Sequence, residues 1–182
     1  TGAPIVLIAA RLLVDKGIRE FVQSAHILRQ RGLSSQDARF VIVGKPDLAN
    51  PASLHPDELL QWAEEGVVEV WGHRTDMPQV MEAAHVVVLP SYYGEGLPKV
   101  LIEAAACGRA VITTDVAGCR DAIYNGVTGV LVPAKDANSL AAAIFDLVAS
   151  PEKCKQMGLE GRKMAEERFD ENIVIKKNMS LY

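Results

Sequence analysis

The sequence has few cysteines and no long hydrophobic run, and both absences narrow the class of protein. Its three cysteines, Cys107, Cys119 and Cys154, form no CxxC pair, which argues against a disulfide framework and against a zinc site. No apolar stretch approaches the roughly 20 residues that a membrane-spanning helix needs, and the amino-terminal segment TGAPIVLIAARL lacks the basic region of a signal peptide. We therefore expect reduced thiols and a cytoplasmic protein.

An excess of positive charge is also lacking. The formal net charge is −4, so a polyanion-binding surface is not indicated and nucleic acid is not an expected partner. The 182 residues, 49% hydrophobic and 23% charged, fit one soluble globular domain with a real core. The chain starts at Thr1 and enters an apolar segment almost at once. We expect it to be a domain excised from a longer protein.

Two common phosphate-binding motifs are absent, and the histidines have no metal-type spacing. The sequence contains neither GxGxxG nor GxxxxGK[ST], which counts against a dinucleotide site and against a P-loop. No metal site is predicted, because no His is suitably spaced from another ligand. Any phosphate must therefore be held in another way.

Strand-like apolar runs alternate with helical patterns along the whole chain. Such alternation predicts an α/β fold, a Rossmann-like doubly wound parallel sheet of about six strands with helices on both faces. The expected strands are 5–10, 40–44, 67–72, 86–89, 110–114 and 129–133. The expected helices are 17–31, 56–65, 78–84, 98–107, 138–149 and one that begins at Pro151, before a final amphipathic segment that runs to Tyr182.

The loop after the first strand, ARLLVDKG, carries two cations. In a doubly wound sheet the ligand lies outside the carboxyl ends of the strands, where Arg11 would stand. Lys16 stands just before the helix that Gly17 is expected to open. Arg and Lys together complement a nucleotide diphosphate. The alternative is that Arg11 is simply solvated and Lys16 pairs with Asp15 or Glu20.

The segment EGLPKVLIE places two carboxylates eight positions apart, one in a loop and one in a helix. Glu103 interrupts an otherwise apolar helix, where a carboxylate is costly unless it is hydrogen-bonded. A ribose diol would supply two donors, whereas the alternative is an i,i+4 ion pair with Lys99. Glu95 lies between two glycines, and the alternative to a functional role is that it is merely solvated.

The turn before this helix is a candidate anion site. Pro98 suits a first helical turn, because the N–H it lacks would have no partner there. The backbone of Gly96, Leu97 and Lys99 could then offer free amides to an anion.

Two further loops give weaker signals. Gly44 ends the second strand, where a ligand could approach the backbone closely, although ordinary turn chemistry at Lys45-Pro46-Asp47 explains it equally well. His73 and Arg74 follow the third strand and would face the same crevice.

Taken together, these segments resemble the carboxyl-terminal, donor-binding half of a retaining glycosyltransferase of family 4, which has the GT-B fold. The resemblance covers nearly the whole chain and rests on ARLLVDKG, VGKPD, VWGHRTDMPQVMEAAHVVVLPS, EGLPKVLIE, ACGRAVITTDVAGCRDAI, NGVTGVLVP and RFDENIVIKKNMSLY. It implies that Arg11 and Lys16 bind the donor diphosphate and stabilise its leaving charge. It also implies that Glu103 binds the ribose, and that Glu95 with the backbone of 96–99 addresses the transferred sugar.

The resemblance carries further expectations about partners. A separate amino-terminal domain would bind the acceptor, so the donor domain alone should be inactive. Residues 170–182 resemble the helix that crosses to that domain. No cofactor or metal is expected, since side-chain cations and helix N-termini would take the place of a metal ion. Membrane association, if any, would be peripheral and through the acceptor domain, at the inner face of the cytoplasmic membrane.

The donor and the class of reaction leave alternatives open. The stretch AGCRDAIYNGVTG is similar to that of enzymes that transfer a hexose or N-acetylhexosamine from a UDP-sugar into lipopolysaccharide or capsule, and GDP-mannose remains an alternative donor. A non-catalytic nucleotide-binding module would be expected to have an acidic cluster at the end of its first strand, but this chain has Arg11 there. A sugar-nucleotide epimerase of related fold would release a free epimer and no glycoside.

Overall fold

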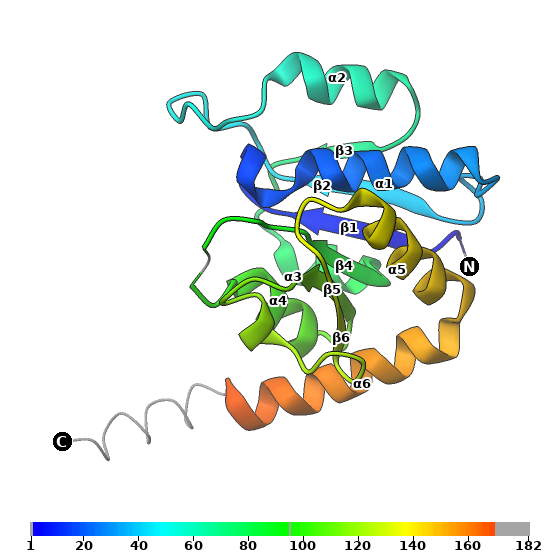
Figure 1. The fold of residues 1–182 in the computed structure, drawn as a ribbon, viewed down its shortest axis with the longest axis vertical. Coiled ribbons are helices and arrows are strands. Elements are labelled where there is room, and N and C mark those ends of the chain that lie inside the picture. The colour runs from blue at the N-terminus through cyan, green and yellow to red at the C-terminus, as the bar shows by residue number, and fades with distance from the viewer. Residues whose placement is uncertain (1, 95, 170–182) are drawn as a thin grey trace.

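Residues 2–94 and 96–169 are described by the structure, a computed structural model, and they form one parallel sheet between layers of helices (Figure 1). The sheet has six strands in the order β3-β2-β1-β4-β5-β6, and each neighbouring pair is parallel. The predicted doubly wound fold is confirmed. The strands are β1 (Ile5–Ala9), β2 (Arg39–Val43), β3 (Glu69–Gly72), β4 (Val86–Leu89), β5 (Ala110–Thr114) and β6 (Gly129–Val132).

The direction of winding reverses between β1 and β4. The chain adds β2 and then β3 on one side of β1, and it returns to place β4, β5 and β6 on the other side. At such a reversal the two crossover connections leave the sheet on opposite faces, which opens a crevice outside the carboxyl ends of the central strands. The loops that follow β1 and β4 therefore border the crevice.

Helices cover both faces of the sheet. Alternate residues of the central strands point to opposite faces, so that Ile8 and Ile42 lie in one buried cluster and Leu7 and Val41 in the other. The first cluster is covered by α1 and α5, and the second by α3 and α4. In addition, α6 packs along α4 and β5. The helices are α1 (Ile18–Gln30), α2 (Pro56–Glu64), α3 (Met77–Ala83), α4 (Lys99–Ala106), α5 (Ala137–Ala149) and α6 (Pro151–Arg168).

Local chemistry explains where several helices begin. The helix α2 starts with a capping box, in which the His55 side chain accepts from the backbone of Asp57 and the Glu58 side chain accepts from the backbone of His55. In α5 the Asp136 carboxylate accepts from the backbone N–H groups of Asn138 and Ser139. These caps satisfy amides that have no partner inside the helix.

Several expected boundaries differ from the observed ones by one or two residues, and two short elements were not expected. Pro98 was predicted to lie in the first turn of a helix over 98–107, but α4 begins at Lys99, and Pro98 is its extended N-cap with ψ 115°. Proline fixes φ alone, so its presence does not decide whether the residue is the first helical one or the cap. A short 3₁₀ helix, η1 (Val14–Lys16), precedes α1, and a second, η2 (Arg120–Ala122), precedes β6.

The predicted crossover helix over 170–182 lies outside the described residues. Within 2–94 and 96–169, no helix has both the length and the apolar character that crossing a membrane requires.

Candidate functional site

The loops after β1 and β4 are joined to one another at the point where the winding reverses. The carbonyl oxygen of Asp15 accepts from the backbone N–H of Tyr92 at 3.0 Å and from the Ser91 hydroxyl at 3.1 Å. Gly17 has φ +74°, and a Cβ there would lie 2.2 Å from the carbonyl oxygen of Pro90. Only glycine fits such an approach, so η1 and the start of α1 are held against the end of β4.

Six of the predicted site residues line one cavity beside this junction. The cavity has a volume of about 390 Å³ and opens at the carboxyl ends of β1, β2 and β3. The predicted residues in its wall are Arg11, Gly44, His73, Arg74, Lys99 and Glu103. The remaining wall residues are Ala9, Ala10, Val43, Lys45, Met77 and Val100.

Charges of both signs line the cavity. Arg11 is exposed and makes no ion pair with any residue that the structure describes. The Glu103 side chain is 38% exposed, and its carboxylate lies 3.3 Å from the Lys99 ammonium, whose side chain is 88% exposed. The ion pair that was the alternative interpretation of Glu103 is therefore present. An exposed i,i+4 pair contributes only about 0.3–0.5 kcal/mol, which leaves the carboxylate able to accept from a ligand.

The glycine that follows β2 is required by the fold itself. Gly44 has φ +146°, and a Cβ there would lie 2.1 Å from the carbonyl oxygen of Ala10. Its N–H donates to the carbonyl oxygen of Gly72 at 2.9 Å. Close backbone packing thus explains this glycine without a ligand, although Gly44 also forms part of the cavity wall.

The two residues after β3 differ in their partners. The Nε of Arg74 donates to the Asp76 carboxylate at 2.7 Å, and this bond holds the pKa of Asp76 down at about 2. The same pair raises the pKa of Arg74. The positive charge of Arg74 is therefore already engaged at the rim of the cavity. His73 is exposed.

Other predicted residues lie elsewhere. Gly96 and Leu97 are exposed, Pro98 is buried, and none of the three lines the cavity. Lys16 belongs to η1 at the junction of the two loops and is also absent from the cavity wall. Glu95 lies outside the described residues.

Lys45, Met77 and Val100 are wall residues that the sequence interpretation did not single out. Lys45 was considered only as part of a turn. The signal that could have found it is its position two residues after the end of β2, next to Gly44. Met77 is the first residue of α3, and Val100 stands one turn before Glu103 on α4, so both needed the helix placements to be known.

The loop after β6 also reaches the junction. The ammonium of Lys135 lies 4.5 Å from the centre of the Tyr92 ring, and Lys135 has φ +59°, an uncommon conformation for a residue other than glycine. This contact ties the segment that follows β4 to the segment that follows β6.

The chemistry of this edge suits a ligand that is both anionic and rich in hydroxyl groups. An unpaired guanidinium can bind phosphate with two parallel hydrogen bonds, and a carboxylate beside it can accept from a diol. No three His, Cys, Asp or Glu side chains among residues 2–94 and 96–169 are grouped so that they could hold a metal ion.

Comparisons with known proteins show the family of the chain. A family model described as "Glycosyl transferases group 1" matches residues 3–150. A Campylobacter jejuni enzyme named N,N'-diacetylbacillosaminyl-diphospho-undecaprenol alpha-1,3-N-acetylgalactosaminyltransferase is 35% identical over 179 residues, which is 98% of this chain and 44% of that enzyme. The capsular polysaccharide biosynthesis glycosyltransferase CapM of Staphylococcus aureus is 30% identical over 172 residues, 94% of this chain and 44% of that protein.

A solved structure shares the fold as well. The crystal structure of Anabaena HepE in complex with UDP superposes on the whole of this chain with a TM-score of 0.86 and 25% identity, and the match covers 50% of that protein. The chain thus spans about half the length of the relatives that it matches.

Proposed function

The chain belongs to the group 1 glycosyl transferases, and we propose that it is the donor-binding half of a retaining enzyme that takes a UDP-sugar as its donor. The observation that carries the proposal is the cavity of about 390 Å³ at the carboxyl edge, in whose wall Arg11 and Glu103 both stand. The family membership confirms the resemblance read from the sequence. It also favours group transfer over a non-catalytic module and over an epimerase.

The proposed roles follow from the chemistry of the wall. Arg11, which has no partner among the described residues, binds the diphosphate as a bidentate donor. Lys16, in η1 on the same loop after β1, adds a second positive charge. Together they stabilise the negative charge that grows on the departing diphosphate, so that no metal ion or other cofactor is needed.

Glu103 accepts hydrogen bonds from the ribose hydroxyls. The Lys99 ammonium can leave Glu103 when the ligand binds, because the Lys99 side chain is almost fully exposed. Gly44 and His73 border the space for the base, where Gly44 lets the ligand approach the backbone. Arg74 contributes to the wall while its charge stays with Asp76.

The transferred sugar is addressed by the segment before α4. Glu95 acts on the sugar, either chemically or by positioning it, with the backbone of Gly96, Leu97 and Pro98 beside it. This segment follows the end of β4, whose neighbouring loop is fixed by the Tyr92 and Ser91 bonds to Asp15. The sugar is a hexose or N-acetylhexosamine.

The acceptor is not expected to bind to these 182 residues. We propose that an amino-terminal domain binds a glycan or lipid-linked acceptor and that the product enters lipopolysaccharide or capsule. Names of relatives support the suggestion, since one names a diphospho-undecaprenol compound and another names capsular polysaccharide biosynthesis. The complete enzyme would then work in the cytoplasm, at the inner face of the membrane.

A calorimetric titration of the 182-residue chain with UDP, UMP and GDP tests the donor assignment. UDP should bind at least about tenfold more tightly than UMP, because the second phosphate adds a charge-assisted contact. UDP should also bind more tightly than GDP. Equal affinity for UDP and GDP, or no binding, would count against the UDP-sugar assignment.

Retention is tested separately with the complete enzyme. Incubation with an α-linked UDP-sugar and a lipid-linked acceptor should give an α-glycoside, identified by the one-bond carbon–proton coupling at the anomeric centre. A β-glycoside would overturn retention, and a free epimer would overturn transfer itself.

A further inference from the structure

A second cavity lies at the opposite edge of the sheet, where the strands begin. It has a volume of about 640 Å³, within the range typical of small-molecule sites. Its wall combines the starts of three strands with the turn between α5 and α6. The wall residues are Pro4, His85, Val86, Gly108, Arg109, Leu147, Val148, Pro151, Cys154 and Lys155. None of them takes part in the proposed donor site.

Two cations in this wall have no carboxylate partner among the described residues. The half-buried Arg109 donates through Nη1 to the carbonyl oxygen of Ala84 at 3.1 Å, while its Nε is buried without any hydrogen-bond partner. Lys155 is exposed and forms no ion pair with a described residue. No Asp or Glu stands among the wall residues. The cavity therefore has an uncompensated positive side.

His85 is a neutral wall residue near Arg109. Its Nδ1 accepts from the backbone N–H of Ile5 at 3.1 Å, so the ring proton is on Nε2. Burial, and then the charge of Arg109, lower the pKa of His85, which keeps the ring neutral at pH 7. The ring therefore adds no charge of its own to the cavity.

The rest of the wall is apolar. Val86, Leu147 and Val148 belong to the buried cluster that lies between the sheet and α5, or pack against it, and Pro4 and Pro151 flank them. An apolar ligand body would replace water along this surface, whereas a small inorganic anion would not use it.

We propose that this cavity, which we call the amino-edge cavity, binds an amphiphilic anion, a carboxylate or phosphate head on a short aliphatic body. The head would lie between Arg109 and Lys155, and the aliphatic body would lie along Val148, Pro4 and Pro151. This site does not depend on the donor assignment at the other edge. For a probe with about ten heavy atoms, binding should fall in roughly the millimolar range.

Titration with three probes, followed by nuclear magnetic resonance, separates the two parts of the ligand. Octanoate has both the anionic head and the aliphatic body, octanol has only the body, and acetate has only the head. Octanoate should shift the backbone amides of Arg109, Cys154 and Lys155, and both other probes should bind at least about tenfold more weakly. Equal binding of octanol would remove the anion from the proposal, and no shift at these amides would overturn it.

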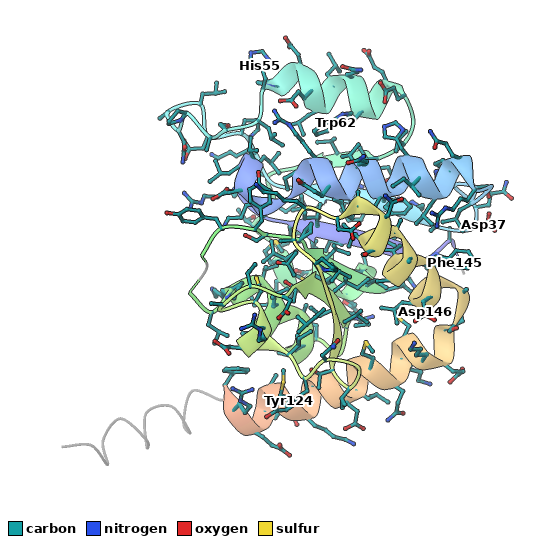
Figure 2. All side chains as sticks on the ribbon, viewed as in Figure 1. Asp37, His55, Trp62, Tyr124, Phe145 and Asp146 are labelled. Carbon is teal, nitrogen blue, oxygen red and sulfur yellow. The ribbon has the colours of Figure 1, made fainter. Side chains whose placement is uncertain are left out.

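Two neighbouring lysines give a matched pair of variants. Lys155→Gln should lower the affinity for octanoate about two- to fivefold, as expected for the loss of an exposed charge. Lys153→Gln should leave the affinity unchanged, because Lys153 is not part of the wall and its ammonium pairs with Asp146 at 2.5 Å. In Figure 2 Asp146 is labelled on α5, close to α6. Equal effects of the two substitutions would show general charge attraction in place of a site.

Arg109→Gln should have the larger effect, about tenfold or more, because Arg109 is half-buried. Since Arg109 also bonds Ala84, a thermal melt must show that this variant is folded. If folded Arg109→Gln binds octanoate as the parent does, the proposal is wrong.

Cys154 offers a readout that does not involve activity. Its thiol lies in the wall, donates to the carbonyl oxygen of His85 at 3.4 Å, and has a pKa raised by burial. Octanoate should slow the alkylation of Cys154 by iodoacetamide and leave that of Cys107 unchanged, since Cys107 lines a different cavity. Should Cys154 be fully protected in the longer protein before any amphiphile is added, a protein segment fills the cavity and the proposal fails.

Discussion

The two edges of the sheet differ in what accompanies their cations. At the carboxyl edge Arg11 shares its cavity with the Glu103 carboxylate. At the amino edge Arg109 and Lys155 share theirs with Leu147 and other apolar side chains. A cation beside a carboxylate selects a ligand with both phosphate and hydroxyl groups, whereas cations beside hydrocarbon select an anion with an apolar body. If both proposals hold, the same kind of charge binds two different kinds of ligand.

The largest expected effect concerns the cations of the carboxyl edge. In the complete enzyme, Arg11→Ala or Lys16→Ala should lower kcat about 10²- to 10³-fold, the usual cost of losing one donor to a developing charge. Initial rates with saturating donor measure the effect. Arg31→Ala is a matched control, because Arg31 is an exposed cation at the far end of α1. Turnover near that of the parent would remove Arg11 or Lys16 from the mechanism.

The next effect concerns the carboxylate that distinguishes this edge. Glu103→Gln should weaken UDP binding about tenfold or more, because a carboxylate accepts a stronger hydrogen bond than an amide does. Calorimetry with UDP and with deoxyuridine diphosphate measures the loss. The variant should bind the two ligands with similar affinity, whereas the parent should prefer the ribose form. An unchanged preference in the variant would contradict the ribose role.

A third effect sharpens the comparison through backbone packing at the carboxyl edge. Gly17→Ala should destabilise the protein by about 1–3 kcal/mol more than Gly32→Ala, because both have positive φ but only Gly17 meets a backbone carbonyl, that of Pro90. Urea denaturation of the two variants gives the difference in the free energy of unfolding. Gly17→Ala should also weaken the binding of UDP, whereas Gly32→Ala should leave the affinity for UDP unchanged. Equal losses of stability in the two variants would mean that the contact between a Cβ at position 17 and the carbonyl oxygen of Pro90 does not destabilise the protein.

The smallest effect is electrostatic and lies at the rim of the same cavity. The folded-state pKa of Asp76, about 2, is below its ordinary value of 3.8 because Arg74 donates to it. The pair therefore stabilises the fold fully above pH 3.8, and this contribution is lost as the pH falls through about 2. A nuclear magnetic resonance titration of the Asp76 carboxyl should show the low pKa, and Arg74→Gln should raise it. A pKa unaffected by that substitution would contradict the pairing.

Many residues of the carboxyl-edge cavity could be predicted from the sequence, because a ligand of a doubly wound sheet binds outside the carboxyl ends of the strands and this rule needs only the order of strands and helices. Arg11, Gly44 and His73 each follow a strand, so alternation of strands and helices was enough to bring them together. Glu103 was found by its unusual apolar surroundings. The predicted roles of these residues remain predictions.

The amino edge could not be predicted in the same way. His85, Arg109 and Lys155 precede strands or stand in a helix, far apart in the sequence and in no motif. Their meeting depends on how α6 packs against β5, which local patterns do not encode. The start of α4 was missed for a related reason, since Pro98 suits both the cap and the first turn.

Hydrogen exchange of the chain with and without UDP tests the central claim most directly. The account predicts that UDP slows exchange at the carboxyl edge, in peptides that contain Arg11, Gly44 and Glu103, and leaves peptides around Arg109 and Cys154 unchanged. Protection around Arg109 and Cys154 in place of the carboxyl edge would contradict it.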